Sequence, residues 1–397
     1  MQPVNKTILD RKRSLKYAFI LGFVGFVTSF GAHIVAVNLP SYAEKVGVGL
    51  AVIGLLIAVY DFAEIIAKPV FGALADKQGM KRTMLVGIAL FTFASLLFLV
   101  IDPKLLIVVR FLQGLGAAAL SAVSLALVGV YYTENRGRAY GVYNAMKGAG
   151  YVVSPIVGGL IVAKSNFSSI FIATAGVGVF AFLLSLLLPD PKAQSKAKFD
   201  DDDDFSFAGF FAVFKEPKLL PWFLVTVVNM FFVSILFGFF PVRVHALGYS
   251  PLASGVLLTV VAASYLLIQP VAGYLADKVD AAITIRLGLL AAGLSIILFP
   301  FVAGIPLVLV SIIAGFGVGT VWTNTDALVS GLAADGKMGA TMGAAGSFKE
   351  LGDMIGPLLI GVLSQAFGLK VGFVTCGVLG LMSLLLIRRN VSAAKQA

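Results

Sequence analysis

The sequence has little of what soluble enzymes depend on. It holds a single cysteine, Cys376, so no disulfide can form within the chain. Its two histidines, His33 and His245, belong to no H-E-x-x-H pattern, and no G-x-S-x-G motif is present. These absences disfavour an enzyme, and we predict no catalytic residue, no metal site and no cofactor.

Charged residues are also scarce. They make up 13% of the 397 residues, against roughly a quarter in soluble domains, whereas 59% are hydrophobic. Apolar stretches recur along the whole chain, each long enough to cross a hydrocarbon core of about 30 Å as a helix. A β-barrel is excluded because its strands would alternate over about ten residues. We predict an all-α polytopic membrane protein with twelve spans, at 17–39, 50–71, 83–101, 105–130, 139–163, 170–188, 219–240, 252–275, 283–302, 305–328, 339–367 and 371–387.

The basic residues are distributed unevenly between these spans. One set of loops holds nearly all of them, and the other set holds only Lys45, Lys104, Lys164, Arg243 and Lys370. By the positive-inside rule both termini are cytoplasmic, which predicts a multi-pass protein of the cell (inner) membrane. The asymmetry also accounts for the net charge of +10, so we expect the lipid bilayer and no nucleic acid as a partner.

The chain repeats itself at one spacing. "KPVFGALADK" (68–77) returns as "QPVAGYLADK" (269–278), and "KGAGYVVSPIVGG" (147–159) returns as "KELGDMIGPLLIG" (349–361). The shifts are 201 and 202 residues. This predicts two six-helix halves, 1–188 and 218–397, joined by a cytoplasmic linker at 189–217 whose acidic run is a solvated segment or a contact for basic loops.

Two motifs of the first half resemble those of the major facilitator superfamily. "GALADKQGMKR" (72–82) is similar to the loop signature between the second and third helices. "RFLQGLG" (110–116) resembles the fourth-helix motif with its embedded arginine. The resemblance implies two pseudo-symmetric halves and a conformational latch, for which the residues are Gly72, Asp76, Gly79, Lys81 and Arg82.

The fifth span resembles the antiporter motif of the same superfamily. The matching residues are Gly141, Gly150, Ser154, Pro155, Gly158 and Gly159, where Ser154 replaces a glycine. The resemblance implies proton-coupled export and the twelve-helix drug:proton antiporter group. The glycines can let helix backbones approach closely, and Pro155 can bend the helix, so plain structural packing is the other interpretation.

The second span carries charges where the sequence is otherwise apolar. Asp61, Glu64 and Lys68 are spaced i, i+3 and i+7, so they lie within about 60° of arc on one helix face. Counting about 1.5 Å per residue places Asp61 near the midplane. A charge there costs at least about 2.5 kcal/mol unless it is paired or faces water.

Partners for these charges are expected on the fifth and eleventh spans. Lys147, and the group Lys349, Glu350 and Asp353, lie well inside their helices. In the arrangement that the resemblance implies, the second and eleventh spans abut across the two halves, so we expect Asp61 and Glu64 to meet Lys349. Carboxylates crowded together in such a setting can exchange a proton near neutral pH, so the proton-coupling candidates are Asp61, Glu64, Glu350 and Asp353. Local i, i+4 pairs, Glu64 with Lys68 and Lys349 with Asp353, are the alternative.

The resemblance also implies a substrate cavity near the midplane. Arg110 can organise it or bond to backbone carbonyls, and Lys68, Lys147 and Lys349 complete the charge network. The lining candidates are Asn38, Gln113, Asn229, Phe232, Phe239, Trp322 and Asn324. We expect His33 to be packed and hydrogen-bonded, and Asp326 to be solvated near a helix end.

These features together predict a proton-driven transporter that works by alternating access. The substrate is a small molecule, protons supply the driving force, and the protein is a monomer. Export of drugs or other lipophilic compounds is one hypothesis. The other hypothesis is export or import of one anionic metabolite or a sugar, because the buried cations roughly balance the buried acids.

Overall fold

The computed structural model describes residues 15–102, 105–132, 136–189, 216–278, 280–332 and 338–387. Within these ranges the regular elements are helices, and no strand occurs. The helices of the first part are α1 (Lys16–Val46), α2 (Leu50–Gln78), α3 (Met80–Leu97), α4 (Leu106–Tyr131), α5 (Arg136–Lys164) and α6 (Ser168–Leu186). The second part holds α8 (Leu220–Gly238), α9 (Phe240–Ala246), α10 (Pro251–Lys278), α11 (Ala281–Leu298), η3 (Phe299–Phe301), α12 (Ile305–Gly331), α13 (Met338–Phe367), α14 (Leu369–Met382) and η4 (Ser383–Leu386).

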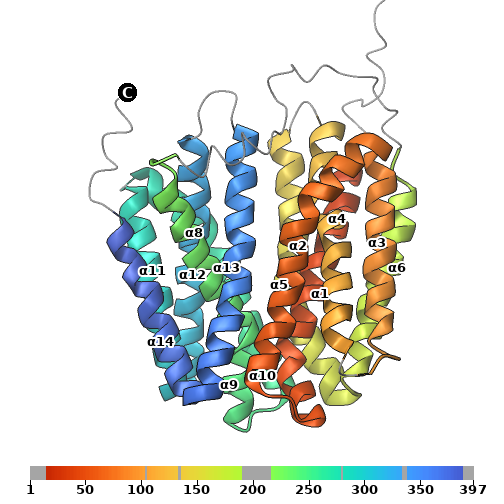
Figure 1. Ribbon diagram of the computed structural model, residues 1–397. Coiled ribbons are helices and arrows are strands. Elements are labelled where there is room, and N and C mark those ends of the chain that lie inside the picture. The colour runs from red at the N-terminus through yellow and green to blue at the C-terminus, as the bar shows by residue number, and fades with distance from the viewer. Residues whose placement is uncertain are drawn as a thin grey trace, which may run out of the picture.

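The helices form two groups that stand side by side. Figure 1 shows α1 to α6 on one side and α8 to α14 on the other, all running roughly parallel or antiparallel to one axis. We call the end at which α1 begins and α2 ends the basic end, after its Lys- and Arg-rich loops, and the other the opposite end. The division at 188 and 218 stays a prediction, since most of the segment between them lies outside the described residues.

Among the described residues, ten helical segments are long and apolar enough to cross a membrane. The helices α13 and α14 are not among them. Three charged residues inside α13, Lys349, Glu350 and Asp353, lower its hydropathy, and α14 has 14 residues. Both coincide with predicted spans, and the count of twelve stays a prediction, as does the cytoplasmic position of the termini.

Two predicted spans differ from the observed helices in their bounds. We expect the second span to end at residue 71, but α2 continues to Gln78 and ends at Gly79, whose φ of 100° suits only glycine. The seventh span is interrupted at Phe239, between α8 and α9 and two residues before Pro241. Hydropathy marks where a helix leaves lipid, whereas backbone geometry decides where it ends.

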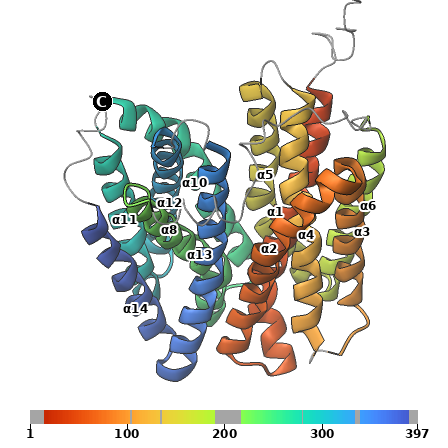
Figure 2. The ribbon, with the colours of Figure 1, turned by 45° about the horizontal axis from the view of Figure 1, so that its top comes forward.

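The two groups meet along two helix crossings, α2 with α13 and α5 with α10. In Figures 1 and 2, α2 and α5 face the second group, with α13 opposite α2. Glycines bring the backbones together near the opposite end. A Cβ atom at Gly159 of α5 would lie 2.5 Å from the Pro251 carbonyl oxygen of α10, and one at Gly361 of α13 would lie 2.9 Å from that of Leu50.

Candidate functional site

A lysine of α2 joins two acids from different halves of the chain. The Lys68 ammonium lies 2.6 Å from Glu64 Oε2, one turn away on the same helix, and also donates a hydrogen bond to Glu350 of α13. Glu64 is 6% exposed, and the side chains of Lys68 and Glu350 are 28% and 20% exposed. The local pair of Glu64 with Lys68 that the sequence spacing allows is therefore present. Lys68 also pairs with Glu350 of the other half.

Two further acids lie near this cluster without an ion pair of their own. Within the described ranges, no hydrogen bond or ion pair involves the Asp61 or Asp353 carboxylate. Asp61 lies in the electrostatic field of Glu350 and Glu64, and Asp353 in that of Asp61 and Glu350. The structure thus gathers the four carboxylates that the sequence singles out, with more acids than bound cations.

Lys349 points elsewhere than the sequence suggests. We expect it to meet Asp61 and Glu64, but its ammonium lies 2.7 Å from Asp326 Oδ2 of α12 and 4.8 Å from the centre of the Trp322 ring. The expectation was wrong because helical spacing fixes the depth of Lys349 but not which neighbour its side chain faces. The alternative pair with Asp353 is not formed either.

Sequence reasoning did not single out Asp326 as a partner of the charged residues. It was expected in solvent, yet its side chain is 28% exposed and paired with Lys349. The helix α12 continues for five residues beyond Asp326, so this residue lies inside the bundle and not at the helix end. Its spacing of four residues from Trp322, which puts both on one helix face, is the signal that could have found it.

Arg110 is buried at 1% exposure and bonds to both backbone and side chain. Its Nε donates to the Leu56 carbonyl of α2 at 3.0 Å, and its Nη1 donates to Gln113 Oε1 at 2.8 Å. The guanidinium stands 4.5 Å from the centre of the Tyr60 ring. Gln113 in turn donates to Ser95 of α3. The bond to a backbone carbonyl is confirmed, and a role in the cavity stays a prediction.

Lys147 and His33 lie on the inner face of the first group. His33 is packed as expected: its Nδ1 lies 2.7 Å from the Ser29 carbonyl oxygen, and its ring lies 4.4 Å from that of Tyr151. Lys147 of α5 lies in the field of Lys68, Glu64 and Glu350. Among residues that the structure describes, no acid lies within ion-pair distance of its ammonium.

The predicted cavity residues separate into two sets. Asn229 and Trp322 line one small cavity together with Asp326 and Lys349. Phe232 instead packs against Gly380 of α14, within the second group. The Asn324 amide donates to Thr284 of α11 at 3.1 Å. Both contacts lie within the second group, and a role of these two residues in the substrate cavity stays a prediction that the family resemblance implies.

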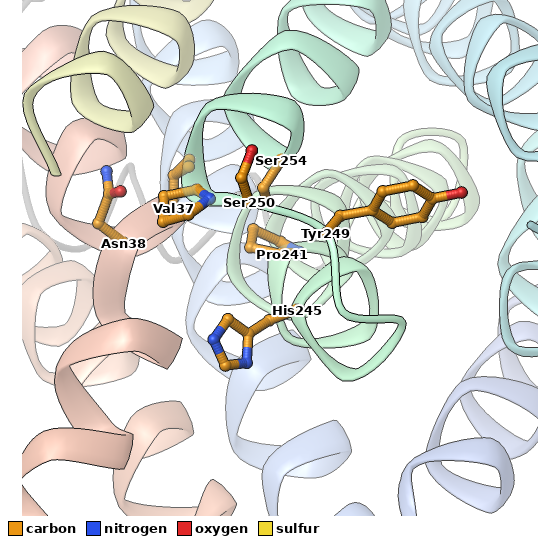
Figure 3. A pocket seen from close by; sticks show the side chains of 8 residues that line it. Val37, Asn38, Pro241, His245, Tyr249, Ser250 and Ser254 are labelled. Atoms are coloured by element: carbon orange, nitrogen blue, oxygen red, sulfur yellow. The ribbon is translucent and has the colours of Figure 1, made fainter. Parts of the chain in front are cut away.

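A second small cavity lies at the opposite end. Residues of α1 and α9 line it, among them Asn38, Pro241 and His245, together with Tyr249 and Ser254 (Figure 3). Its volume is about 10 Å³, room for about one water molecule. Phe239 is fully buried near Gly361, where the halves meet. Asn38 and Phe239 therefore lie at the closed end of the bundle.

The latch residues lie at the basic end. Lys81 donates to the Leu186 carbonyl at the end of α6 at 3.1 Å, and Arg82 is exposed. No described atom would contact a Cβ at Gly72. The side chain of Asp76 lies outside the described residues, so its role in the latch stays a prediction.

The antiporter-type residues of α5 serve different contacts. A Cβ at Gly150 would lie 2.8 Å from Ser29 Cβ of α1, and one at Gly158 would contact Asn38, so both pack α5 within the first group. Gly159 packs against α10 across the halves. Ser154 is fully buried, and Pro155 lies inside the uninterrupted helix. At Gly141, no described atom lies within 4 Å of such a Cβ, so the expected close packing is absent there.

A bundle of apolar helices in two packed groups, with buried charges where the groups meet, defines a polytopic membrane protein. The sequence model of the Major Facilitator Superfamily matches residues 21–255 and 222–397. The chain belongs to this superfamily.

Relatives of the chain carry names of drug-resistance proteins. It is 35% identical over 149 residues to the multidrug resistance protein Stp of Mycobacterium tuberculosis, a stretch that covers 37% of this chain and 28% of Stp. It is 27% identical over 162 residues to the quinolone resistance protein NorA of Staphylococcus aureus, covering 40% of this chain and 42% of NorA. The chain thus matches less than half the length of each relative.

Solved structures share the fold. The nucleoside transporter NupG superposes with a TM-score of 0.78 at 13% identity over 97% of this chain and 100% of that one. A POT family transporter in complex with 5-aminolevulinic acid gives a TM-score of 0.76 at 14% identity over 97% of each chain. At such identities the likeness shows the fold alone.

Proposed function

We propose that this protein is a proton-coupled secondary transporter of the cell membrane, with twelve spans and cytoplasmic termini, that exports small lipophilic compounds by alternating access. The observation that carries the proposal is the double engagement of Lys68. Its ammonium binds Glu64 from one half and Glu350 from the other, in a region with two further carboxylates. A proton added there changes the attraction between the halves.

The coupling follows from charge balance. With all acids ionised, Lys68 is shared and the halves are held together at this point. Protonation of Glu350 or Glu64 removes one of the two attractions, and protonation of Asp61 or Asp353 removes repulsion between like charges. Each proton therefore alters the free-energy difference between the two orientations of the halves.

The packing of the halves supports a rocking movement. The close glycine contacts between them, at Gly159 and Gly361, lie toward the opposite end. One described ion pair, Lys68 with Glu350, connects them nearer the basic end. Backbone contacts of this kind act as a rigid closure, whereas an ion pair can open when its charge changes.

Export is supported by the antiporter-type residues of α5 and by the relatives whose names refer to drug resistance. The alternative is a carrier of one anionic metabolite. Lys147 favours it, because a half-buried ammonium without a described acidic partner can hold an anion. A thermal-shift screen of the purified protein against lipophilic dyes, sugars and organic acids separates the two. Stabilisation by many dyes supports export of lipophilic compounds, and stabilisation by one acid supports the alternative.

Reconstituted vesicles test the proton coupling. An imposed pH gradient should drive a lipophilic dye across the membrane, and Asp61→Asn and Glu64→Gln should each reduce that transport at least tenfold. The exposed Glu216→Gln serves as the matched control, because it removes one carboxylate outside the helices. Transport that continues at an equal rate after the gradient is collapsed, or in both variants, contradicts the proposal.

A further inference from the structure

Lys349 occupies a position that suits a separate cation. Its ammonium is held by the Asp326 carboxylate at 2.7 Å and by the face of the Trp322 ring at 4.8 Å from the centroid. Trp322 and Asp326 are four residues apart on α12 and thus share one face. An aromatic face beside a carboxylate is the usual protein receptor for an organic ammonium ion.

The cavity next to this pair contains polar atoms without partners. It is lined by Lys349, Asp326 and Trp322 and by the neighbouring side chains of Thr226, Asn229, Met230 and Thr325. Asn229 Oδ1 and Thr325 Oγ1 are buried without a hydrogen-bond partner in the described structure, and both residues are 2% exposed. An unsatisfied buried polar atom destabilises the protein, and a ligand that donates a hydrogen bond to it would remove that cost.

The cavity is small because Lys349 stands in it. Its present volume is about 10 Å³, which holds about one water molecule. Movement of the lysine side chain would add the volume of four methylenes and an ammonium. The Lys349 side chain is 20% exposed, so it can leave without unpacking the helices.

A second acid is ready to receive the displaced lysine. Asp353 follows Lys349 by one turn on α13, and no ion pair of its carboxylate occurs within the described ranges. A Lys and an Asp at i and i+4 on a helix can pair. Lys349 can therefore exchange Asp326 for Asp353, which lies in the field of Asp61 and Glu350.

We propose that Trp322 and Asp326 form a binding site for a lipophilic organic ammonium ion, and that the Lys349 side chain is its internal occupant, which the ligand displaces toward Asp353. The proposal rests on the proposed function in that the ligand would be an exported substrate. Binding itself requires no proton gradient, so it can be tested separately from transport.

Tryptophan fluorescence gives a direct test. The chain has two tryptophans, and Trp222→Phe leaves Trp322 as the single reporter. The probe is 4-phenylbutylammonium, and 4-phenylbutanol is its uncharged control. In detergent at constant pH, the ammonium probe should quench Trp322 and the alcohol should not. Asp326→Asn should weaken binding at least tenfold.

Two substitutions of Lys349 should act in opposite directions. Lys349→Met removes the occupant and should tighten binding about tenfold, which corresponds to about 1.4 kcal/mol. Lys349→Arg supplies a planar cation that stacks on Trp322 and grips the carboxylate with two hydrogen bonds, so it should weaken binding. A purely structural lysine would instead lose binding in Lys349→Met and retain it in Lys349→Arg.

The proposal is overturned if Lys349→Met, with an unfolding midpoint near that of the parent, binds the probe no more tightly, or if the alcohol binds equally well. Should Lys349→Met not fold, the comparison of Asp326→Asn and Lys349→Arg with the parent still decides. Proton-driven transport of a neutral dye together with no ammonium binding would reject this site alone. Ammonium binding without gradient-driven transport would reject the proposed function alone.

Discussion

At the scale of single residues, Lys68 connects acids that belong to different halves. Its flexible stem and compact ammonium let it reach Glu64 and Glu350 together, whereas a guanidinium prefers one planar carboxylate partner. Both acids are largely buried, so the lysine offsets charges that would otherwise repel each other. Removing Lys68 should therefore lower the stability of the protein by more than one ordinary surface ion pair contributes.

Lys68→Met should therefore destabilise the protein by about 3 kcal/mol, the lower end of the cost of leaving a buried charge unpaired, because the side chain is 28% exposed. The measurement is the thermal unfolding midpoint in detergent. Adding Glu64→Gln to Lys68→Met removes one of the uncompensated charges and should recover part of the loss. An unchanged midpoint for Lys68→Met alone would show that the pair contributes little.

Arg110 is held by a different set of partners. Its replacement should therefore destabilise the protein for a different reason. Arg110→Lys keeps the charge, but an ammonium cannot donate to Leu56 and Gln113 in the same plane. We expect a loss of about 2 kcal/mol, the value of one buried hydrogen bond to a charged group. Thermal unfolding again gives the answer, and a midpoint equal to that of the parent would contradict the expectation.

The residues show what the sequence could predict at this scale. A stripe of acids on α2 and their meeting with α13 follow from spacing and from the internal repeat, and Glu64 and Glu350 do share a cation. The identity of that cation was wrong, since Lys349 faces Asp326. Spacing gives the depth and the face of a helix, while the rotation of its neighbour depends on packing over the whole bundle.

At the scale of elements, the crossing of α5 and α10 is held by backbone contact. A Cβ at Gly255 would collide with the Pro155 carbonyl of α5, and Thr259 donates to the Val152 carbonyl at 2.9 Å. Because these are backbone atoms in the middle of helices, no small side-chain movement can relieve the collision. The crossing can accept a larger residue only if the two helices separate.

Gly255→Ala should thus drive the halves apart at the opposite end, at a cost of about 1–3 kcal/mol, typical of overpacking. Spin labels on Leu99 and Ile305, which are 38% and 76% exposed, report the separation between the halves there. In a background with Cys376→Ser, electron-electron double resonance should show a longer distance in Gly255→Ala.

The matched control lies on the same pair of helices. A Cβ at Gly148 would lie 3.4 Å from a terminal methyl of Leu266, an ordinary contact with a flexible side chain. Gly148→Ala should leave the distance unchanged. If Gly148→Ala and Gly255→Ala lengthen it equally, the collision with Pro155 is not the cause.

The positions of the helices were largely predictable from hydropathy, because each apolar stretch of about twenty residues coincides with a helix. The close crossing was predictable only in part. The glycines of α5 indicate tight packing, but sequence alone does not assign Gly159 to α10 and Gly150 to α1, as the structure does. Small residues show that a helix has a near neighbour and leave open which one it is.

At the scale of the whole molecule, the two crossings are copies of each other. Gly54 of α2 lies against the Pro357 carbonyl of α13, as Gly255 of α10 lies against that of Pro155. The two glycines are separated by 201 residues and the two prolines by 202, which are the shifts of the sequence repeat. The molecule thus closes its opposite end with the same contact twice, on either side of the central region.

The symmetry leads to a last prediction. Gly54→Ala should lengthen the distance between labels on Leu99 and Ile305 as Gly255→Ala does, because each Cβ meets a proline carbonyl of the other half. Closure at this end needs both crossings to form together, so the double variant should shift the distance little beyond either single one. Two independent crossings would instead add their effects. If only one of the two substitutions lengthens the distance, the halves pivot about the other crossing. The two repeated contacts would then not be equivalent in closing this end.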